Sequence, residues 1–323
     1  MKKILVTGGA GYIGSVTVKR LLENNFDVVV FDNLVYGHKE SVSCKLVQGD
    51  LTNYEDITKG LGNENFDAVI HFAAYALAGE SMENPHKYFY NNTVGGLNLL
   101  KFMKEKNIPN IVFSSSCSIF GTPKTMPVSE NLEKHPESVY AQSKLMFEEI
   151  LAWYDQIFNI KHINLRYFNA SGAAIDGSLG ENHDPETHII PIAIQTALGK
   201  REKFVIFGGD YPTKDGTNIR DYIHIEDLAT VHIQALNKLA KDHRSDSFNI
   251  GTGKGYSNKE IVDMVKKISG VDFPVEISKR RPGDPAEIFA DNKKAKEVLG
   301  FDPKYSDIET IVKTAWEWHS KRS

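Results

Sequence analysis

The fold is decided by the stretch Ile4-Leu5-Val6-Thr7-Gly8-Gly9-Ala10-Gly11-Tyr12-Ile13-Gly14. A short apolar run stopped by glycine is typical of a buried parallel strand. Gly8, Gly11 and Gly14 follow with the spacing G-x-x-G-x-x-G: the first allows a tight turn, the second lets backbone approach a pyrophosphate, and the third lets the next helix pack closely. The sequence therefore predicts a strand, a phosphate-binding turn and a helix whose N-terminus favours an anion.

A second apolar strand, Val28-Val29-Val30-Phe31, ends at Asp32. Asp32 lies 18 residues beyond Gly14, close to the ~20 expected for a carboxylate that accepts a hydrogen bond from an adenosine ribose. Because a carboxylate there would repel a 2′-phosphate, the pattern predicts NAD rather than NADP. The alternative is a solvated aspartate that opens the Asn33-Leu34 turn.

Length and charge limit the possible functions. With 323 residues the chain is expected to form about two domains. A net charge of −4 gives no indication of a nucleic-acid or acidic-membrane surface, so phosphates must be met by particular cations and backbone groups. The two cysteines are too few for a disulfide framework, and no run approaches the ~18 apolar residues of a membrane span. We expect a cytoplasmic protein.

Apolar runs alternate with helical patterns over the first half of the chain. Further strands are expected at 45–47, 68–72, 110–113 and 162–167, and helices at about 53–60, 84–105 and 138–158. Strand alternating with helix predicts an α/β fold with a doubly wound parallel Rossmann sheet over residues 1–170. Small or polar residues follow each strand at the sheet edge where ligands bind.

The regular alternation of strand and helix patterns ends after Ala170. A Gly/Asp/His-rich stretch precedes an expected helix at 188–199, and shorter elements follow. We expect residues 171–323 to form a smaller C-terminal α/β substrate domain, with segments at about 221–250 returning to the first domain. No Pro/Ser-rich linker marks the boundary.

Tyr140 and Lys144 are the predicted reacting pair. Residues i and i+4 share one helix face, about 5–6 Å apart at Cβ. An ammonium about 5 Å from the phenol contributes roughly 3 kcal/mol towards the phenolate, which lowers the phenol pKa by about 2.4 and suits general acid–base work. Ser116, at the end of the 110–113 strand run, is the predicted hydroxyl that bonds the substrate oxygen. The alternatives are an exposed helical pair and serines that merely cap a strand.

Together these motifs resemble the extended short-chain dehydrogenase/reductase family, and within it most closely the UDP-glucose 4-epimerases, from residue 3 to about 320. The matching segments are Thr7–Ser15, Asp32–Leu34, His71–Ala74, Tyr140–Lys144, Leu165–Asn169, Arg220–His224 and Arg280–Asp284. The last two lie in the substrate half, which makes the resemblance more specific than a shared nucleotide fold.

The resemblance implies a tightly held NAD that is not consumed. With the glycine turn, the expected NAD site comprises Gly8, Gly11, Tyr12, Ile13, Gly14, Asp32, Asn33, Asp50, Leu51, Phe72, Ala73, Ala74, Asn91, Ser114, Tyr140, Lys144 and Tyr167. The expected UDP-sugar site comprises Ser116, Tyr140, Phe168, Asn169, His188, Ile189, Val205, Phe207, Arg220, Arg281, Asp284 and Ile288.

The two arginines of this set, Arg220 and Arg281, offer planar forks suited to a pyrophosphate. The alternative is that they are surface ion-pair partners of Asp221 and Asp284.

One position departs from the pattern of the family, and the sequence shows no metal-binding motif near the expected site. The family often has a lysine near the pyrophosphate after His71-Phe72, whereas this chain has Ala76, so the amides of the glycine turn are expected to carry more of that binding. His183 and His188 are the closest histidine pair near the expected site, and they lack a closed ligand set at usable spacing. We therefore expect no catalytic metal.

The resemblance implies interconversion of UDP-glucose and UDP-galactose through a transient 4-keto sugar. The residue at Ile288 would gate the space for a 2-acetamido group, and its intermediate size leaves UDP-N-acetylglucosamine/UDP-N-acetylgalactosamine as an alternative. A dehydratase is disfavoured because Ser116-Cys117-Ser118 has no carboxylate, and a reductase because position 32 is acidic. A non-catalytic NAD-sensing protein of this fold is a further alternative.

The helices at 84–105 and 138–158 carry more apolar positions than one sheet face needs. The resemblance implies that they pair two copies into a homodimer; burial within one subunit is the other interpretation.

Overall fold

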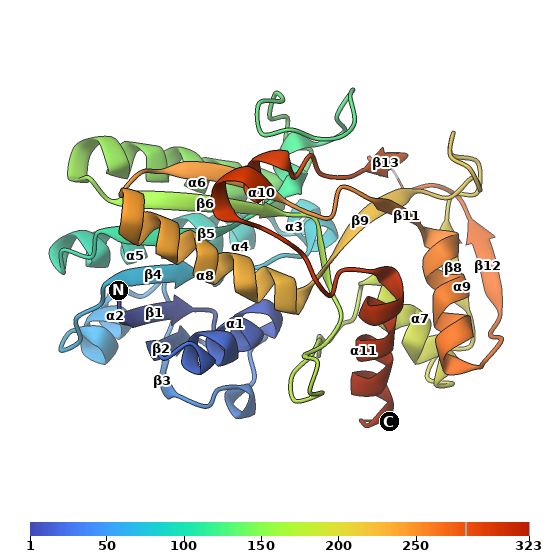
Figure 1. The fold of residues 1–323 in the computed structure, drawn as a ribbon, viewed down its shortest axis with the longest axis horizontal. Helices are drawn as coiled ribbons and strands as arrows, with labels where there is room; N and C mark the ends of the chain where they lie inside the picture. Colours follow the sequence, from blue (N-terminus) through green and yellow to red (C-terminus); the bar gives the residue numbers. More distant parts are fainter. Residues whose placement is uncertain (282, 323) are drawn as a thin grey trace.

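The computed structural model describes residues 1–281 and 283–322 (Figure 1). Pro282 of the Arg280–Asp284 motif lies outside the described residues.

A seven-stranded sheet with the strand order β10-β6-β5-β4-β1-β2-β3 forms the centre of the first half. Every neighbouring pair in it is parallel. Its strands are β1 (Lys3–Thr7), β2 (Asp27–Asp32), β3 (Lys45–Gln48), β4 (Ala68–His71), β5 (Asn110–Ser116), β6 (Lys161–Tyr167) and β10 (Asp246–Ile250). The chain order reverses at β1, between β2 and β4, and this is where an open parallel sheet binds ligands. The predicted doubly wound fold is confirmed.

Helices cover both faces of this sheet (Figure 1). The strands send alternate side chains to the two faces, so Ile4 and Val6 lie in one core while Leu5 lies in the other. The first core is closed by α1 (Tyr12–Glu23), α8 (Ile225–Asp242) and α10 (Lys293–Leu299). The second is closed by α2 (Tyr54–Leu61), α5 (Gly95–Glu105) and α6 (Val139–Phe158). Each fully buried aliphatic side chain contributes about 1.5–3 kcal/mol, which makes the sheet a rigid support for its edge.

The helix predicted at about 84–105 is confirmed in extent, but it is not α-helical throughout. After a separate short helix, α3 (Ala78–Glu83), the helix runs directly through α4 (Pro85–Tyr88), a π-helical segment (Phe89–Val94) and α5. Asn92 lies within the π-helical segment and is buried there. It accepts from the Tyr75 amide at 2.9 Å and donates to the Tyr75 carbonyl at 3.1 Å and to Ser143 Oγ at 2.9 Å.

The second half contains smaller sheets and a helical layer. A four-stranded sheet is formed by β7 (Asn169–Ser171), β9 (Ile219–His224), β11 (Gly255–Ser257) and β13 (Glu287–Ile288), and β8 (Phe204–Phe207) pairs with β12 (Val275–Ser278). A third core is packed by α7 (Ile189–Ala197), α9 (Asn258–Ser269) and α11 (Ile308–Ser320). Two elements from this half of the chain belong to the large sheet instead: α8 packs against it, and β10 is one of its strands. In the described part of the chain, no helix is long and apolar enough to span a membrane.

Candidate active site

The glycine turn after β1 has the backbone geometry that its spacing predicts. Gly8 has φ +72°, and a Cβ on it would lie 2.5 Å from the Ala73 amide nitrogen. A Cβ on Gly14 would lie 2.2 Å from the Gly8 carbonyl oxygen, so α1 can approach the turn only without a side chain there. Gly11 is the N-cap of α1, and no side chain caps this helix end. The turn therefore presents open amides to an anion and fits a dinucleotide pyrophosphate.

Asp32 ends β2 and is only 7 % exposed. Its Oδ2 accepts from the Ala10 amide at 3.0 Å, and its Oδ1 accepts from the Leu34 amide at 2.9 Å. The carboxylate thus braces the glycine turn and also opens the turn after β2. The two interpretations of Asp32 from the sequence are compatible, because each carboxylate oxygen can accept a further hydrogen bond.

Asp50 follows β3 at the same edge of the sheet. Its Oδ1 accepts from the Thr52 amide at 2.8 Å and the Thr52 hydroxyl at 2.7 Å, and Asn33 Nδ2 donates to its Oδ2 at 3.3 Å. Burial alone would raise the pKa of Asp50, but the hydrogen bonds from Thr52 and Asn33 lower it. Asp50 is therefore an anion that fixes Asn33 beside the adenosine end of the expected site.

Two aromatic side chains predicted for the NAD site meet the same histidine. The Phe72 ring lies 4.7 Å from the His232 ring, and Tyr167 Oη lies 3.0 Å from His232 Nε2. A third predicted aromatic residue, Tyr12, has a different partner. Its hydroxyl donates to the Gly172 carbonyl at 2.5 Å, which ties α1 to the second half of the chain. The other residues of this set lie on or beside these elements: Ile13, Leu51, Ala73, Ala74, Asn91 and Ser114.

The reacting pair lies in the first two turns of α6. Ser138 caps this helix by accepting from the Ala141 amide. Lys144 Nζ donates to the Ser114 carbonyl at 2.7 Å and lies 5.8 Å from the centre of the Tyr140 ring. Ser116 is the last residue of β5, and its Oγ accepts from Ser118 Oγ at 2.9 Å. The structure thus brings the three predicted catalytic residues to one place.

The predicted lowering of the phenol pKa is wrong for the protein alone. Burial raises the pKa of Tyr140 to about 12, against a smaller lowering by the hydrogen bond from Ser116. Burial also lowers the pKa of Lys144 to about 7, against an opposing effect of Glu148. The expected shift assumed a partly solvated pair, whereas burial in the folded site disfavours both the phenolate and the ammonium. A further positive charge is needed to ionise the phenol at neutral pH.

Buried groups that the sequence reasoning missed support this pair. Ser81 is fully buried and its Oγ accepts from the Tyr140 amide at 3.1 Å. Glu148 accepts from Arg166 Nε at 2.9 Å and Nη2 at 2.6 Å, which links α6 to β6. These partners lie far apart in the chain, so no local motif indicates them.

His71 lies beside the lysine as an uncharged neighbour. Its Nδ1 is 2.7 Å from Thr7 Oγ1. Burial, and the nearby Lys144, lower the pKa of His71 to about 3. The imidazole is therefore neutral and does not compete with Lys144 as a cation.

A lysine from another element supplies a charge near the segment after His71-Phe72. Lys87 of α4 places its Nζ 4.5 Å from the centre of the Tyr75 ring and 2.6 Å from Glu80 Oε1. The hydrogen bond that Lys87 donates to Glu80 raises the pKa of Lys87, so the group stays charged. Ala76 itself has no charge, as expected, but the segment does have a cation beside it.

The predicted pyrophosphate arginines have different surroundings. Arg220 of β9 pairs with Asp284 and donates from Nη1 to the Ile219 carbonyl at 2.7 Å. Arg281 stacks on the Phe207 ring of β8, with 3.9 Å from its guanidinium carbon to the ring centre. Asp221 is buried instead, and accepts from backbone amides such as that of Thr252 at 2.9 Å. The alternative pairing of an arginine with Asp221 is wrong, while Arg220 with Asp284 is observed.

Arg220 also connects the second half to the catalytic strand. Burial raises the pKa of Cys117 to about 12, and the charge of Arg220 opposes this rise. The guanidinium therefore lies near the residue that follows Ser116. Ile288 pairs with Arg220 in the sheet register, and its side chain is buried in a cluster with Phe168.

The remaining predicted substrate residues are spread over the second half. Asn169 donates from Nδ2 to the Asp221 carbonyl at 2.9 Å. Val205 lies on β8, and Ile189 begins α7. His188 does not present a free imidazole, because its Nδ1 lies 2.7 Å from Glu181 Oε1 and 3.0 Å from Glu186 Oε1.

The ion pairs of His188 change its protonation. Burial would lower the pKa of His188, but Glu181 and Glu186 together raise it to about 10. Contrary to the expectation from their spacing, the two histidines do have carboxylates beside them. The donor atoms of Glu181, His183, Glu186 and His188 all lie within 4.8 Å of one another. Only the fold shows that both carboxylates turn towards the histidines.

The chain is similar to known proteins over nearly its whole length. Residues 4–251 match the NAD dependent epimerase/dehydratase family. The UDP-glucose 4-epimerase of Streptococcus mutans is 49% identical over 321 residues, covering 98% of this chain and 96% of that protein.

Two solved structures are similar over almost the whole chain. The UDP-glucose 4-epimerase from Brucella ovis in complex with NAD has a TM-score of 0.95 at 43% identity and covers 98% of each chain. The UDP-Glc/GlcNAc 4-epimerase from Campylobacter jejuni has a TM-score of 0.87 at 41% identity, covering 99% of this chain and 100% of that one. The chain thus belongs to the NAD dependent epimerase/dehydratase family, as a relative of the UDP-glucose 4-epimerases.

Proposed function

We propose that this protein interconverts UDP-glucose and UDP-galactose with NAD as a resident cofactor. The observation that carries the proposal is the assembly of Ser116, Tyr140 and Lys144 at the sheet edge beside the glycine turn. A protein that only sensed NAD would need the turn but not a buried phenol and amine. Relatives with nearly the full length of this chain are UDP-glucose 4-epimerases.

The cofactor site is proposed on the fit of the residues present. The amides after Gly8 and Gly11 would bind the pyrophosphate, Asp32 and Asn33 the adenosine ribose, and Lys144 the nicotinamide ribose. A Cβ at Gly14 would close this cradle, as the contact with the Gly8 carbonyl shows. When bound, NAD accepts a hydride from C4 of the sugar and can return it to either face.

Proton transfer is assigned to Tyr140. The phenolate takes the proton from the sugar 4-hydroxyl, and the Ser116 hydroxyl positions that oxygen. Because burial raises the pKa of Tyr140 to about 12, the ammonium of Lys144 and a cationic cofactor ring must act together to ionise it. The same groups return the proton when the 4-keto sugar is reduced.

Substrate anchoring is assigned to the nucleotide end. Arg220 and Arg281 provide the cations for the pyrophosphate, and Asp284 orients Arg220 through their ion pair. The sugar end is proposed to face apolar Phe168 and Ile288, which make few directional contacts. Firm binding of UDP with weak binding of the hexose would allow the sugar to turn between the two hydride transfers.

The N-acetylated sugars are the second candidate substrates. Ile288 is 6 % exposed and packs with Phe168, so an acetamido group would need this cluster to move. The Campylobacter jejuni relative is named a UDP-Glc/GlcNAc 4-epimerase. We propose that UDP-galactose is the better substrate and that UDP-N-acetylgalactosamine turns over more slowly.

The test is an assay of the purified protein with each UDP-sugar and no added NAD. We expect conversion of UDP-galactose to UDP-glucose, NAD released on denaturation, and a loss of at least about 1,000-fold in kcat for Tyr140→Phe. Tyr90→Phe, at an exposed tyrosine, is the matched control and should keep full activity. Protein without nicotinamide that also fails after reconstitution with NAD would contradict the proposal.

We also propose a cytoplasmic homodimer. Apolar side chains on α5 and α6 are exposed, among them Leu97 (38 %), Trp153 (62 %) and Ile157 (62 %). Burial within one subunit does not account for them, and a second copy laid along both helices would cover them. Trp153→Glu should shift the mass measured by light scattering from two chains to one; a wild-type mass of one chain would contradict the dimer.

The division of the chain is likewise a proposal. Residues 1–170, with α8 and β10, would bind NAD, and the rest of residues 171–323 would bind the UDP-sugar. Limited proteolysis with and without UDP should show protection confined to the second set.

A further inference from the structure

The loop between β7 and α7 contains four potential metal ligands with the spacing E-x-H-x-x-E-x-H. They are Glu181, His183, Glu186 and His188, referred to below as the loop cluster. The two carboxylate side chains are 5 % and 3 % exposed, whereas the imidazoles are 28 % and 51 % exposed. The mechanism above uses none of these groups as an acid or base.

The distances within the loop cluster suit a small cation. His183 Nδ1 lies 3.0 Å from Glu181 Oε1 and 4.0 Å from Glu186 Oε2. His188 Nδ1 lies 2.7 Å from Glu181 Oε1 and 3.0 Å from Glu186 Oε1. Ligand atoms about 2.0–2.1 Å from a tetrahedral zinc ion are about 3.3 Å from each other, which falls inside this range. Small side-chain rotations would therefore suffice to form the site.

The chemistry of the donors selects the ion. Two carboxylates bring two negative charges into a nearly dry place, and their ion pairs with His188 balance only one of them, so a divalent ion that displaces the His188 proton would balance both. Imidazole with carboxylate is a donor set that zinc accepts, whereas calcium and magnesium prefer oxygen donors alone.

Neighbouring groups hold the ligands as outer partners of a metal site do. Glu186 Oε1 accepts from the Thr187 amide at 2.7 Å and the His188 amide at 2.8 Å. Trp318 Nε1 of α11 donates to the Glu181 carbonyl at 2.8 Å. The two amides orient the Glu186 carboxylate before an ion arrives, and Trp318 fixes the backbone that carries Glu181.

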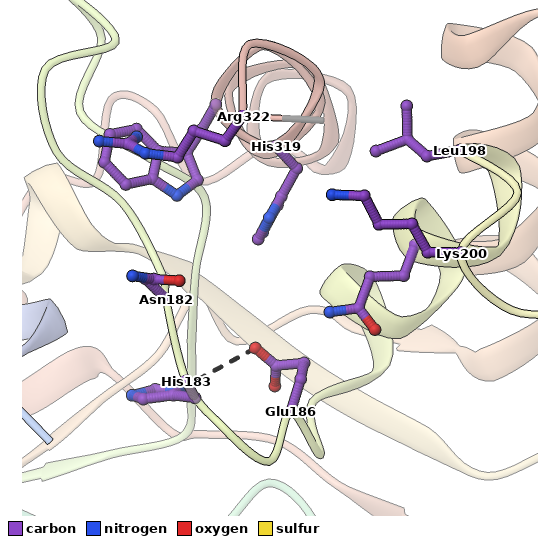
Figure 2. A pocket seen from close by; sticks show the side chains of 9 residues that line it. Asn182, His183, Glu186, Leu198, Lys200, His319 and Arg322 are labelled. Atoms are coloured by element: carbon purple, nitrogen blue, oxygen red, sulfur yellow. Dashed lines mark ion pairs between the residues drawn. The ribbon is translucent and has the colours of Figure 1, made fainter.

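The loop cluster borders a pocket that is open to solvent. A cavity of about 120 Å³ is lined by His183 and Glu186 together with Lys200, His319 and Arg322. In Figure 2 the Glu186 and His319 side chains point into this cavity from opposite sides. An ion would thus have a path of entry from this side.

We propose that the loop cluster binds one zinc ion per chain as a structural site. Four protein donors leave no coordination position for a substrate, and the catalytic residues lie on β5 and α6 instead. The ion would fix the loop at two functional points. The His183 ring lies edge-on to Tyr12, 6.1 Å between ring centres, beside the glycine turn, and His188 directly precedes α7.

The test is isothermal titration of the chelator-treated full chain with zinc chloride. We expect one equivalent per chain and no comparable binding of magnesium chloride. His183→Gln/His188→Gln should weaken zinc binding by at least about 100-fold, whereas His86→Gln, at an exposed histidine of α4, should leave it unchanged. Zinc at 100 times its dissociation constant should raise the midpoint of thermal unfolding of the wild type by about 5 °C.

A second measurement, on the wild type alone, tests the proposal even where the double variant does not fold. Cobalt(II) added to the wild type should give the intense visible absorption of a four-coordinate ion, and zinc should remove it. Wild-type protein that binds no zinc, zinc binding that survives unchanged in the double variant, or only the weak absorption of a six-coordinate cobalt ion would overturn the proposal.

Discussion

Replacing Lys144 by methionine tests the electrostatic account of the catalytic pair. The change keeps an unbranched side chain in the buried turn of α6 and removes the ammonium that donates to the Ser114 carbonyl at 2.7 Å. Tyr140, Ser116 and their backbone supports stay in place. The loss therefore reports how much this charge contributes to the phenolate.

The magnitude follows from the distance. A charge 5.8 Å from the phenol ring centre stabilises the phenolate by about 3 kcal/mol at an effective dielectric near 20, or about 100-fold. Burial holds the pKa of Lys144 at about 7, so the lysine is charged below that pH and loses its proton above it. The ratio of wild-type to variant kcat should be about 100 below pH 7. It should fall as the pH rises from 7 to 9, because only the variant continues to gain phenolate.

The assay is steady-state epimerisation of UDP-galactose from pH 6 to 9, with the NAD content of each preparation measured. Lys101→Met on α5, at an exposed lysine, is the control for removal of a positive charge. A loss of less than fivefold at pH 6, or a ratio that does not change with pH, would refute the reasoning.

Three further outcomes follow from the same structure. Burial lowers the pKa of Lys144 from 10.5 to about 7, so between these pH values the unfolded chain binds more protons than the folded protein, and stability rises with pH. Lys144→Met removes the cost of burying this charge. In urea unfolding it should therefore stabilise the NAD-free protein by about 2–4 kcal/mol at pH 6.5 and by less at pH 9.5. Gly14→Ala puts a Cβ 2.2 Å from the Gly8 carbonyl and should lower NAD affinity at least about tenfold by fluorescence titration, whereas Gly79→Ala, with open space around it, should not. Glu148→Gln removes the negative charge that balances the buried Arg166 guanidinium and should lower the free energy of unfolding by about 3–5 kcal/mol, with exposed Glu149→Gln as the neutral control.

The local sequence pattern predicts the large sheet well, because the side chains within a segment largely decide whether it forms a buried strand. Ile4 and Val6 alternate with Leu5 between two cores, and glycine stops the run at the turn. The roles of Gly8 and Gly14 also follow from local geometry, since each depends on what an added Cβ would meet.

Features that depend on distant partners could not be predicted in this way. The electrostatics of Tyr140 depend on burial, which no spacing reveals and which reverses the expected direction of its pKa. Lys87 reaches Tyr75 from another helix. The loop cluster needs a loop conformation that turns Glu181 and Glu186 inward, and sequence spacing of histidines alone gives no sign of it.

The π-helical segment Phe89–Val94 makes chain length in this region critical. Asn92 sits within it and holds the Tyr75 backbone and Ser143 together. Because each residue advances an α-helix by about 100°, deleting one residue between Tyr88 and Asn92 would swing the amide a quarter-turn or more away from both partners. Evolution of this enzyme can therefore exchange side chains around the segment more readily than it can shorten it.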